Sequence, residues 1–485
     1  MNEQARVKPV FSQAKRQHVL GVLRFFTRNV WTLARSFWPV LAGLAISDSI
    51  RMYAGLIGAV GVLFLSVVAF LEHWRFTFKI EASALVIERG IIERERMVIP
   101  FDRIQTVHTE ELFWHRMFGL VGLRIDTAGS SGAEVEISAL KKSEAQQLNA
   151  ILSRGAMSHS EAVQPLVQLD WQKLLRIGLT QNHLRNAIIS FGAVVAVIEP
   201  LMQWLEQGMD ALPWAWVWAL KLIWVLAIPL FFLFFLLVGL LVSLVGAILR
   251  YHKLTVRLAD NQLEMSGGFL KRFEFKLPLH KIQMLESKSG ILQRIAGFET
   301  VRIHQARSQV TSDGGAVNVL IPGLNDQETA VLASRLFLED FTRDAKVLRP
   351  HRLFWIRRSI WRSVFGLIPF LLLPHPLVLV LFIAWMLWSV LASLRKYQGT
   401  SFVVKPTELL FRTGWRVQVK RRVEWRKLQR VSIRSNWFMQ RKGLADVVLS
   451  TAAGPITLPY VRVESAKQLR DWGLFQIESS SAPWM

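Results

Sequence analysis

Long uncharged runs alternate along this chain with regions of mixed apolar and polar residues. Met52 to Leu71, Leu222 to Leu249 and Ser363 to Leu394 carry no charge for 20, 28 and 32 positions. About 20 apolar residues are enough to cross a bilayer as one helix. With the weaker apolar runs beside them, these segments predict about six transmembrane helices, paired as three hairpins.

Each hairpin is followed by a region in which apolar and polar residues alternate with the period of β-strands. In the first region Phe76, Phe78 and Ile80 point one way, and Thr77 and Lys79 point the other. Six or seven such strands occupy about 80 residues of each region. An amphipathic helical pattern then closes the region, and in the second region a capping box is expected at its start. We therefore expect three small β-barrels or sandwiches, each plugged by a C-terminal helix.

A spacing of glycine, glutamine and glycine recurs in every region without a slip. The glutamine stands 15 residues after the first glycine, and the second glycine stands 14 residues after the glutamine. Two apolar residues also stand six and five positions before the second glycine. The first glycine suits a hairpin turn that needs positive φ, so we interpret the repeat as a folding signature. Its nine positions are Gly90, Gln105, Gly119, Gly268, Gln283, Gly297, Gly414, Gln429 and Gly443.

The hairpins and the strand-rich regions alternate, and basic, partly apolar stretches typical of interfacial helices lead into the hairpins. The predicted order is a basic tail at 1–29, a hairpin at 30–71, a soluble domain at 72–154, a linker with an interfacial helix at 155–185, a hairpin at 186–249, a domain at 250–342, a linker with an interfacial segment at 343–356, a hairpin at 357–394 and a domain at 395–478.

The residues around the repeat resemble a known family. Ile99 to Gln105 reads IPFDRIQ, Leu277 to Gln283 reads LPLHKIQ, and the third region has VEWRKLQ without the proline. Together with Gly119-Leu120 and Thr127-Ala128-Gly129, this run resembles the bacterial pleckstrin-homology-like (PH-like) domain. The variety is the one found in YdbT-type bacterial membrane proteins, where such domains alternate with helical hairpins. The resemblance covers the whole chain. It implies three PH-like domains but says little about activity, because the family is described mainly by its architecture.

Composition and charge restrict the location. The chain is 52% hydrophobic and has no cysteine, which excludes disulfides and thiol chemistry and fits a reducing cytosol. The N-terminal region lacks the apolar core and cleavage site of a secretory signal, so the first membrane helix is expected to act as an uncleaved anchor. Nearly all basic residues lie outside the tight hairpin connections. The positive-inside rule then places both termini and all three domains on the cytoplasmic side of a bacterial plasma (inner) membrane.

The sequence contains no recognised catalytic pattern. Nucleophile-elbow, zinc-protease, phosphate-loop and dinucleotide motifs are all missing. We therefore expect no enzyme activity, no catalytic or metal-binding residue and no cofactor. His108 and His115 lack clustered carboxylates and are interpreted as packing or surface residues. Glu199, Lys221 and Arg362 lie toward the ends of apolar segments, where snorkelling explains them, although intramembrane charges also mark transport pathways.

Positive charge is the strongest functional signal. Residues 72–185 have no net charge, residues 250–358 carry +7, and residues 395–485 carry +11. A basic face tethered beside anionic lipid gains about 1 kcal/mol per residue near the surface. The simpler alternative is a solvated face. Nucleic acid is disfavoured because no reading module is recognised and the chain is tethered. The proposed lipid- or partner-binding residues are Arg412, Arg416, Lys420, Arg421, Arg422, Arg426, Lys427, Arg430 and Arg434.

These patterns predict a noncatalytic membrane-anchored scaffold. It would present three PH-like domains at the cytoplasmic membrane face to anionic lipids or to a membrane or cytosolic protein partner, in envelope maintenance or defence. The alternative is a transporter or channel component in which the PH-like domains are regulatory. The sequence leaves the oligomeric state open.

Overall fold

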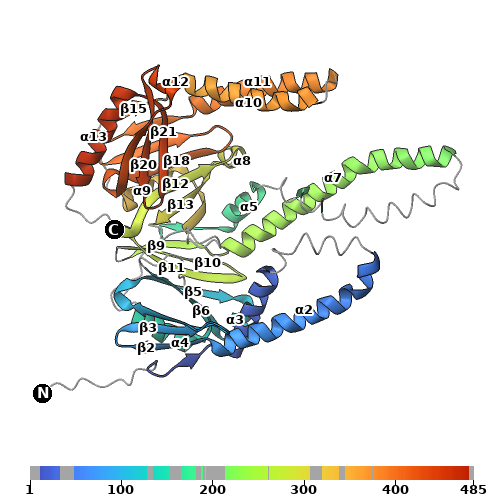
Figure 1. Cartoon of the computed structure of the whole chain (residues 1–485), viewed down its shortest axis with the longest axis vertical. Coiled ribbons are helices and arrows are strands. Elements are labelled where there is room, and N and C mark those ends of the chain that lie inside the picture. Colours follow the sequence, from blue (N-terminus) through green and yellow to red (C-terminus); the bar gives the residue numbers. More distant parts are fainter. Residues whose placement is uncertain are drawn as a thin grey trace. The chain divides into compact units, whose positions relative to one another are not determined.

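The structure of the protein is a computed structural model (Figure 1). It describes residues 11–32, 48–127, 135–152, 165–181, 187–188, 192, 214–259, 261–305, 319–337, 345–372 and 376–479. The chain divides into two compact units. The first unit comprises 1–163, 264–276 and 308–315, and the second comprises the remainder. We call the three strand-rich regions copy one (72–154), copy two (250–342) and copy three (395–478).

Copy one is a sandwich of two antiparallel layers closed by a helix, as the alternation predicts. Phe78 and Leu85 from one layer meet Leu123 and Ile137 from the other in a shared core, and Leu148 of the closing helix packs against them. The elements are β2 (Thr77–Glu81), β3 (Ala84–Arg89), β4 (Glu95–Pro100), η2 (Phe101–Arg103), β5 (Ile104–Leu112), α3 (Phe113–Met117), β6 (Leu120–Thr127), β7 (Val135–Lys141) and α4 (Lys142–Leu152).

Copies two and three repeat this order of elements. The predicted capping box is confirmed, because Asn325 Oδ1 accepts from the Glu328 amide at 2.7 Å and Glu328 Oε2 accepts from the Asn325 amide at 3.0 Å. Copy two contains β9 (Thr255–Ala259), β10 (Gln262–Gly267), β11 (Lys271–Pro278), η3 (Leu279–Lys281), β12 (Ile282–Ser289), α8 (Ile291–Ile295), β13 (Glu299–Gln305), β14 (Val319–Leu324) and α9 (Asp326–Leu336). Copy three contains β16 (Ser401–Val404), β17 (Glu408–Thr413), β18 (Gln418–Glu424), η4 (Trp425–Lys427), β19 (Leu428–Arg434), α12 (Trp437–Gln440), β20 (Leu444–Thr451), β21 (Gly454–Arg462) and α13 (Val463–Ser479).

The repeated glycines occupy turns, which confirms their interpretation as a folding signature. The glycines that open the repeat have φ values of +106°, +97° and +100°, and those that close it have +65°, +72° and +60°. At Gly414 a Cβ would also collide with the backbone oxygen of Val417. The glutamines differ in environment. Gln283 is fully buried and Gln429 is exposed, while the side chain of Gln105 lies outside the described residues.

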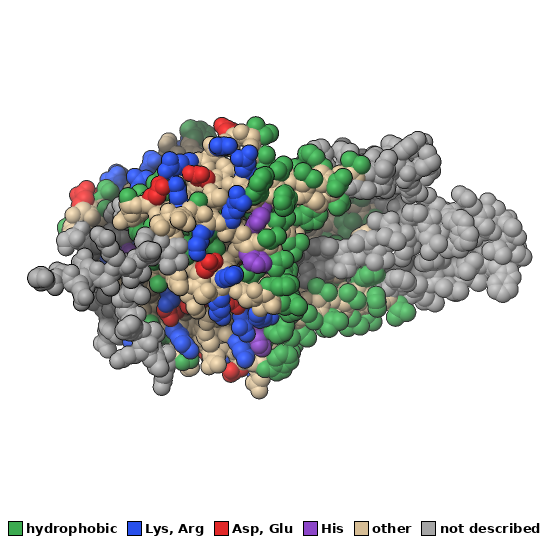
Figure 2. All heavy atoms as spheres, turned by 90° about the horizontal axis from the view of Figure 1, so that it is seen from below, with side chains coloured by type: hydrophobic (Ala, Val, Ile, Leu, Met, Phe, Trp, Pro, Cys, Tyr) green, Lys and Arg blue, Asp and Glu red, His purple; other side chains and the backbone are tan. Residues whose placement is uncertain are grey.

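Long apolar helices extend from the sheets, and hydrophobic side chains cover their described surfaces (Figure 2). Six spans are expected from the sequence. Within the described residues, two helices are long and apolar enough to cross a membrane, Leu233–Tyr251 and Pro376–Gln398. The expected first helices of the first two hairpins fall almost entirely outside the described residues. The helices outside the copies are α2 (Asp48–Arg75), α5 (Trp171–Leu179), α7 (Trp214–Tyr251), α10 (Leu353–Leu372) and α11 (Pro376–Gln398).

In the region of the third predicted hairpin, α10 ends at Leu372, α11 begins at Pro376, and the two helices lie side by side (Figure 1). The linker at 155–185, where an interfacial helix is expected, contains the helix α5. Its apolar face packs on the described part of copy two, where Ile177 lies against Gly323 of β14.

Each hairpin is preceded by a short strand that joins the first layer of the copy that follows the hairpin in sequence. β1 (Lys15–Arg16) pairs with β2, β8 (Val167–Gln168) pairs with β9, and β15 (Lys346–Leu348) pairs with β16. Phe11, just before β1, is fully buried in the core of copy one. The segments predicted as a tail and linkers therefore contribute to the folded sheets. Strands of two or three residues are too short to produce a periodic signal.

Successive copies are also joined by shared sheets. In the first unit the strand order β7-β6-β5-β11 links copy one to β11 of copy two. In the second unit the order β14-β13-β12-β18-β17-β16-β15 links copy two to copy three. Hydrophobic alternation does not predict this continuity, because it fixes which face of a strand is buried and not which strand lies beside its edge. We call these pairings the first junction (β5 with β11) and the second junction (β12 with β18).

Candidate functional site

Each copy exposes apolar side chains on one very short helix, α3, α8 or α12. Trp114 is 38% exposed, Phe118 just after α3 is 59% exposed, Ile295 is 79% exposed, and Phe438 is 66% exposed. Each helix links the second layer's first strand to its second strand and has four or five residues, too few to turn every apolar side chain toward the sandwich core. We call these three helices, with the residues up to the closing glycine, the apolar tips.

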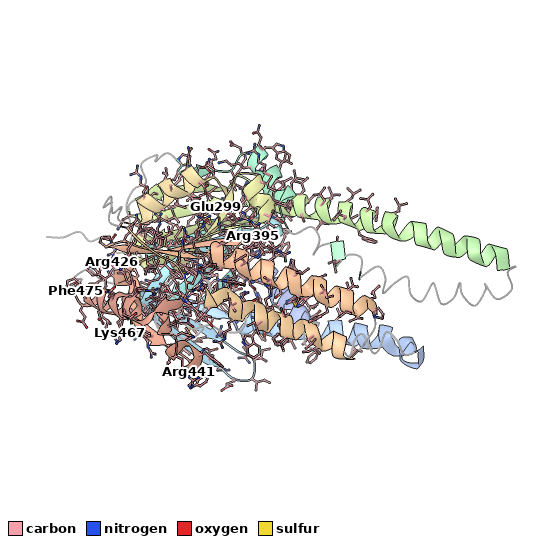
Figure 3. All side chains as sticks on the ribbon, turned by 90° about the horizontal axis from the view of Figure 1, so that it is seen from above. Glu299, Arg395, Arg426, Arg441, Lys467 and Phe475 are labelled. Atoms are coloured by element: carbon pink, nitrogen blue, oxygen red, sulfur yellow. The ribbon has the colours of Figure 1, made fainter. Side chains whose placement is uncertain are left out.

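The apolar tips lie at the end of each copy from which the long helices extend (Figure 1). In the view of Figure 1, α3 is drawn near the sheet-side end of α2 in the first unit, and α12 near the sheet-side ends of α10 and α11 in the second. Arg441, next to α12, is closer to these helices than Arg426, Lys467 and Phe475 are (Figure 3). In each unit taken by itself, a membrane crossed by the long helices would therefore meet the apolar tip at that end first.

The apolar tip of copy three combines aromatic rings with positive charge. The Arg441 guanidinium lies 3.7 Å from the centroid of the Trp437 ring. Arg441, Lys442 and Arg434 are exposed. The helix itself is fixed by Asn436, whose Oδ1 accepts from the amide of Met439 at 3.0 Å. An aromatic residue stacked under a guanidinium presents an apolar body and a cationic head, which suits the boundary between acyl chains and lipid headgroups.

The nine basic residues selected from the sequence do not form one surface. Lys420 Nζ lies 3.1 Å from both Glu299 Oε2 and Asp326 Oδ1, across the second junction. Arg421 Nε lies 2.7 Å from Glu286 Oε2 across the same junction.

Three more of the nine have partners near the second junction. Arg422 Nε lies 3.4 Å from Glu408 Oε2, and Arg426 Nε lies 2.8 Å from Glu424 Oε2. Lys427 is buried and donates to the backbone oxygen of His280. The remaining four, Arg412, Arg416, Arg430 and Arg434, are exposed.

The second junction is an electrostatic cluster with a buried carboxylate at its centre. Burial by itself would raise the pKa of Glu286, but the nearby His304, Lys288 and Arg421 side chains outweigh burial and hold that pKa well below its ordinary value. Burial would lower the pKa of Lys420, but Glu299 and Asp326 hold it above its ordinary value. Glu286 and Lys420 are therefore both charged at neutral pH, and each is paired with oppositely charged residues inside the protein.

The remaining sequence candidates are placed as follows. His108 stacks on Phe275 with ring centroids 4.2 Å apart, which confirms its interpretation as a packing residue. His115 is buried. The Arg362 guanidinium lies 4.7 Å from the Trp388 ring centroid. Glu199 and the side chain of Lys221 lie outside the described residues, so their role in a transport pathway stays a prediction.

Sequence reasoning did not select the apolar tips or Arg441 and Lys442. Their signal is visible, since two apolar residues stand at the same place before each closing glycine. Such a pair reads equally well as core, and only the fold shows that it faces outward.

The comparisons with known proteins agree with the threefold layout. The family described as Bacterial PH domain matches residues 32–156, 210–337 and 362–474. Each matched segment starts within or near a predicted hairpin and ends in or close to the closing helix of a copy. A relative from Bacillus subtilis (strain 168), the UPF0699 transmembrane protein YdbT, is 26% identical over 425 residues, covering 83% of this chain and 81% of the relative.

Proposed function

The chain belongs to the bacterial PH domain family, and we propose that it is a noncatalytic membrane-anchored scaffold that holds three PH-like domains against the cytoplasmic face of a bacterial plasma membrane. The observation that carries the proposal is the position of the apolar tips. Every copy turns a tip toward the end from which its long helices extend. A soluble partner alone would not require the same apolar feature at the same end of three copies.

Membrane anchoring is supported from three directions. Two described helices have the length and hydropathy of membrane spans, the relative from Bacillus subtilis is named a transmembrane protein, and each of the three predicted hairpins contains an uncharged run of 20 or more residues. We propose six spans in three hairpins. The relative's printed name says nothing of a ligand or partner, so the contacts of this chain are argued from its own residues.

The apolar tip of copy three is the one we propose for anionic lipid. Arg434, Arg441 and Lys442 are exposed at or beside it, and each basic residue near an anionic leaflet contributes about 1 kcal/mol. Trp437 and Phe438 add apolar area for the interface. The tips of copies one and two contain fewer exposed basic residues and would contact membranes of either charge. A protein partner bound at the domain surface remains part of the scaffold proposal.

Depth measurements in a bilayer test the lipid contact. The chain has no cysteine, so Phe438→Cys gives one labelling site in the full-length protein. Lys467→Cys on α13 is the matched control, because Lys467 is exposed in the same copy but lies farther from the long helices (Figure 3). In nanodiscs, a fluorescent label at 438 should be shielded from an aqueous quencher and reached by a lipid-attached quencher. Equal aqueous quenching at both sites would contradict the proposal.

The charge contribution is tested by changing the lipid and the basic residues. Shielding at 438 should be stronger in anionic than in zwitterionic nanodiscs and should weaken as salt rises, because salt screens exposed charges. Arg441→Glu with Lys442→Glu should remove this lipid dependence. Lys467→Glu with Arg470→Glu changes the net charge equally on α13 and should leave it intact. Chemical crosslinking in intact cells, followed by identification of copurifying proteins, addresses the scaffold's partner.

A further inference from the structure

The chain forms the same kind of junction twice. The two strands that would form a third such junction each lie at the edge of a sheet. At both junctions the first strand of one copy's second layer pairs antiparallel with the last strand of the next copy's first layer. In copy three the strand equivalent to β5 and β12 is β19, and it is an edge of its sheet. In copy one the strand equivalent to β11 and β18 is β4, and it is also an edge of its sheet. Among the strands that the structure describes, these two are the unpaired equivalents of the junction strands.

The two junctions have the same register, measured from the repeated glycine and glutamine. Lys271, three residues after the turn glycine, lies opposite Leu112, seven residues after the glutamine. At the second junction Gln418, four residues after its glycine, lies opposite Ser289, six residues after its glutamine. Each step forward on one strand is a step back on the other, so the alignment is identical. The register is therefore a property of the repeat and can be applied to β4 and β19.

That register makes the free edges complementary. It places Glu95 of β4 opposite Arg434 of β19, and both side chains are exposed. Glu95 corresponds to Phe273 and Val419 at the existing junctions, and Arg434 corresponds to Glu110 and Lys288. Opposite charges at directly facing positions stabilise a strand pair, and a bare sheet edge offers backbone groups to any matching strand.

The loops beside the junctions point to the same arrangement. At the first junction Arg116 of α3 donates to the backbone oxygen of Phe269 in the next copy's turn, at 3.3 Å. At the second junction Arg294 of α8 donates in the same way to Trp415, at 2.5 Å. In the equivalent turn of copy one, the side chain of Ile92 is 99% exposed. The glutamine position behaves alike, because Gln283 next to a junction is buried and Gln429 on the free edge is exposed.

We propose that β19 of one molecule pairs antiparallel with β4 of a second copy of this chain, forming a third junction between molecules. The contact uses two different surfaces and is therefore heterologous, so repetition produces a closed ring or an open filament of PH-like copies in the membrane plane. The proposal concerns self-assembly and does not depend on lipid contact at the apolar tips.

Disulfide trapping in the cysteine-free full-length chain tests the proposal. Directly opposite residues of an antiparallel pair have Cα atoms about 4.5–5.5 Å apart, within disulfide range. Glu95→Cys with Arg434→Cys should convert monomer into a ladder of dimers and higher species when membranes are oxidised. Glu95→Cys with Ser435→Cys is the matched control, because a one-residue shift turns the second thiol to the other face. Lys288→Cys with Val419→Cys, facing positions of the second junction, is the positive control and should close within one chain.

Mixing single variants separates contacts between chains from contacts within one. Molecules with only Glu95→Cys, mixed with molecules with only Arg434→Cys, should form a crosslinked dimer that neither forms alone. A disulfide that changes gel mobility without increasing mass would overturn the proposal by showing closure within one chain. Equal yields from the in-register and shifted pairs, or no ladder while the positive control closes, would overturn it as well. Crosslinking to a different protein instead of a second copy would assign the edge to that partner and also overturn it.

Discussion

Arg421 Nε lies 2.7 Å from Oε2 of Glu286, and the two residues belong to different copies of the repeat. Glu286 is directly opposite Arg421 in the register of the second junction, and its side chain is 2% exposed. The ion pair therefore lies on the strand pairing that makes two sandwiches share one sheet. A buried carboxylate that loses a cationic partner is costly, so this pair couples the two copies energetically.

Arg421→Met should loosen the second junction. Glu286 keeps Lys288 and His304 nearby, so we expect a loss of about 2 kcal/mol, the scale of one hydrogen bond to a buried charge. Hydrogen–deuterium exchange of peptides covering β12 and β18 measures the change locally. Arg470→Met removes an exposed pair with Asp471 and should change exchange little. Equal effects of the two substitutions would contradict a coupling role for Arg421.

Acid should weaken the same junction. The pKa of Glu286 is held below its ordinary value of 4.5, so the stabilisation is fully present above pH 4.5 and is lost as the pH falls through the folded-state pKa. Thermal unfolding of the full chain should therefore change little between pH 7 and pH 5 and shift to lower temperature as the pH falls from 5 to 3. Glu286→Gln should start from a lower transition temperature and show a smaller shift. An unchanged pH dependence in that variant would assign the acid sensitivity to other groups.

Gly414→Ala and Gly443→Ala separate a steric requirement from a conformational one. Both glycines have positive φ, which costs an L-residue about 1–2 kcal/mol. Only at Gly414 does a new Cβ also collide with the Val417 backbone, whereas nothing lies near it at Gly443. The Gly414 variant should therefore lose more stability and disturb β17 and β18, measured by hydrogen exchange. Equal losses would show that the turn after β17 relaxes freely.

Phe11→Ala tests whether the N-terminal segment is part of copy one. The ring is fully buried against Phe78, with centroids 6.1 Å apart, and removing a buried aromatic side chain typically costs about 3–5 kcal/mol. Exchange of β2 and β3 should rise, and copy three should be unaffected. Ser12→Ala, one residue away and exposed, is the control. Unchanged exchange protection of β2 in the Phe11→Ala variant would contradict the idea that this segment is part of copy one.

The sequence predicts local structure better than it predicts partners. Alternation gives the two layers, and the glycine spacing gives the turns, because both depend on residues close in the chain. The pairing of β12 with β18 joins residues 129 to 137 positions apart and depends on backbone edges, which carry no hydrophobic pattern. Lys420 illustrates the consequence, since its charge suggests a membrane surface until Glu299 is seen beside it.

The candidate site was only partly accessible to the same reasoning. Arg430 and Arg434 are exposed, as a basic surface requires, but Arg421 and Lys427 are used inside the protein. A count of charges along the chain cannot separate these cases, because the acids that pair with Lys420 and Arg421 come from the preceding copy. Exposed apolar residues at a short turn are equally ambiguous until both flanking strands have a known direction.

The short strands ahead of the hairpins constrain how the chain threads a bilayer. β1 and β2 are neighbours in one sheet, as are β8 and β9, and β15 and β16, yet each pair is separated in sequence by a hairpin. Paired strands lie about 4.8 Å apart, whereas a hydrocarbon core is about 30 Å thick. Each excursion must therefore cross the membrane an even number of times and return to its starting side. Each copy therefore lies on the same side of the bilayer as the short strand that precedes its hairpin.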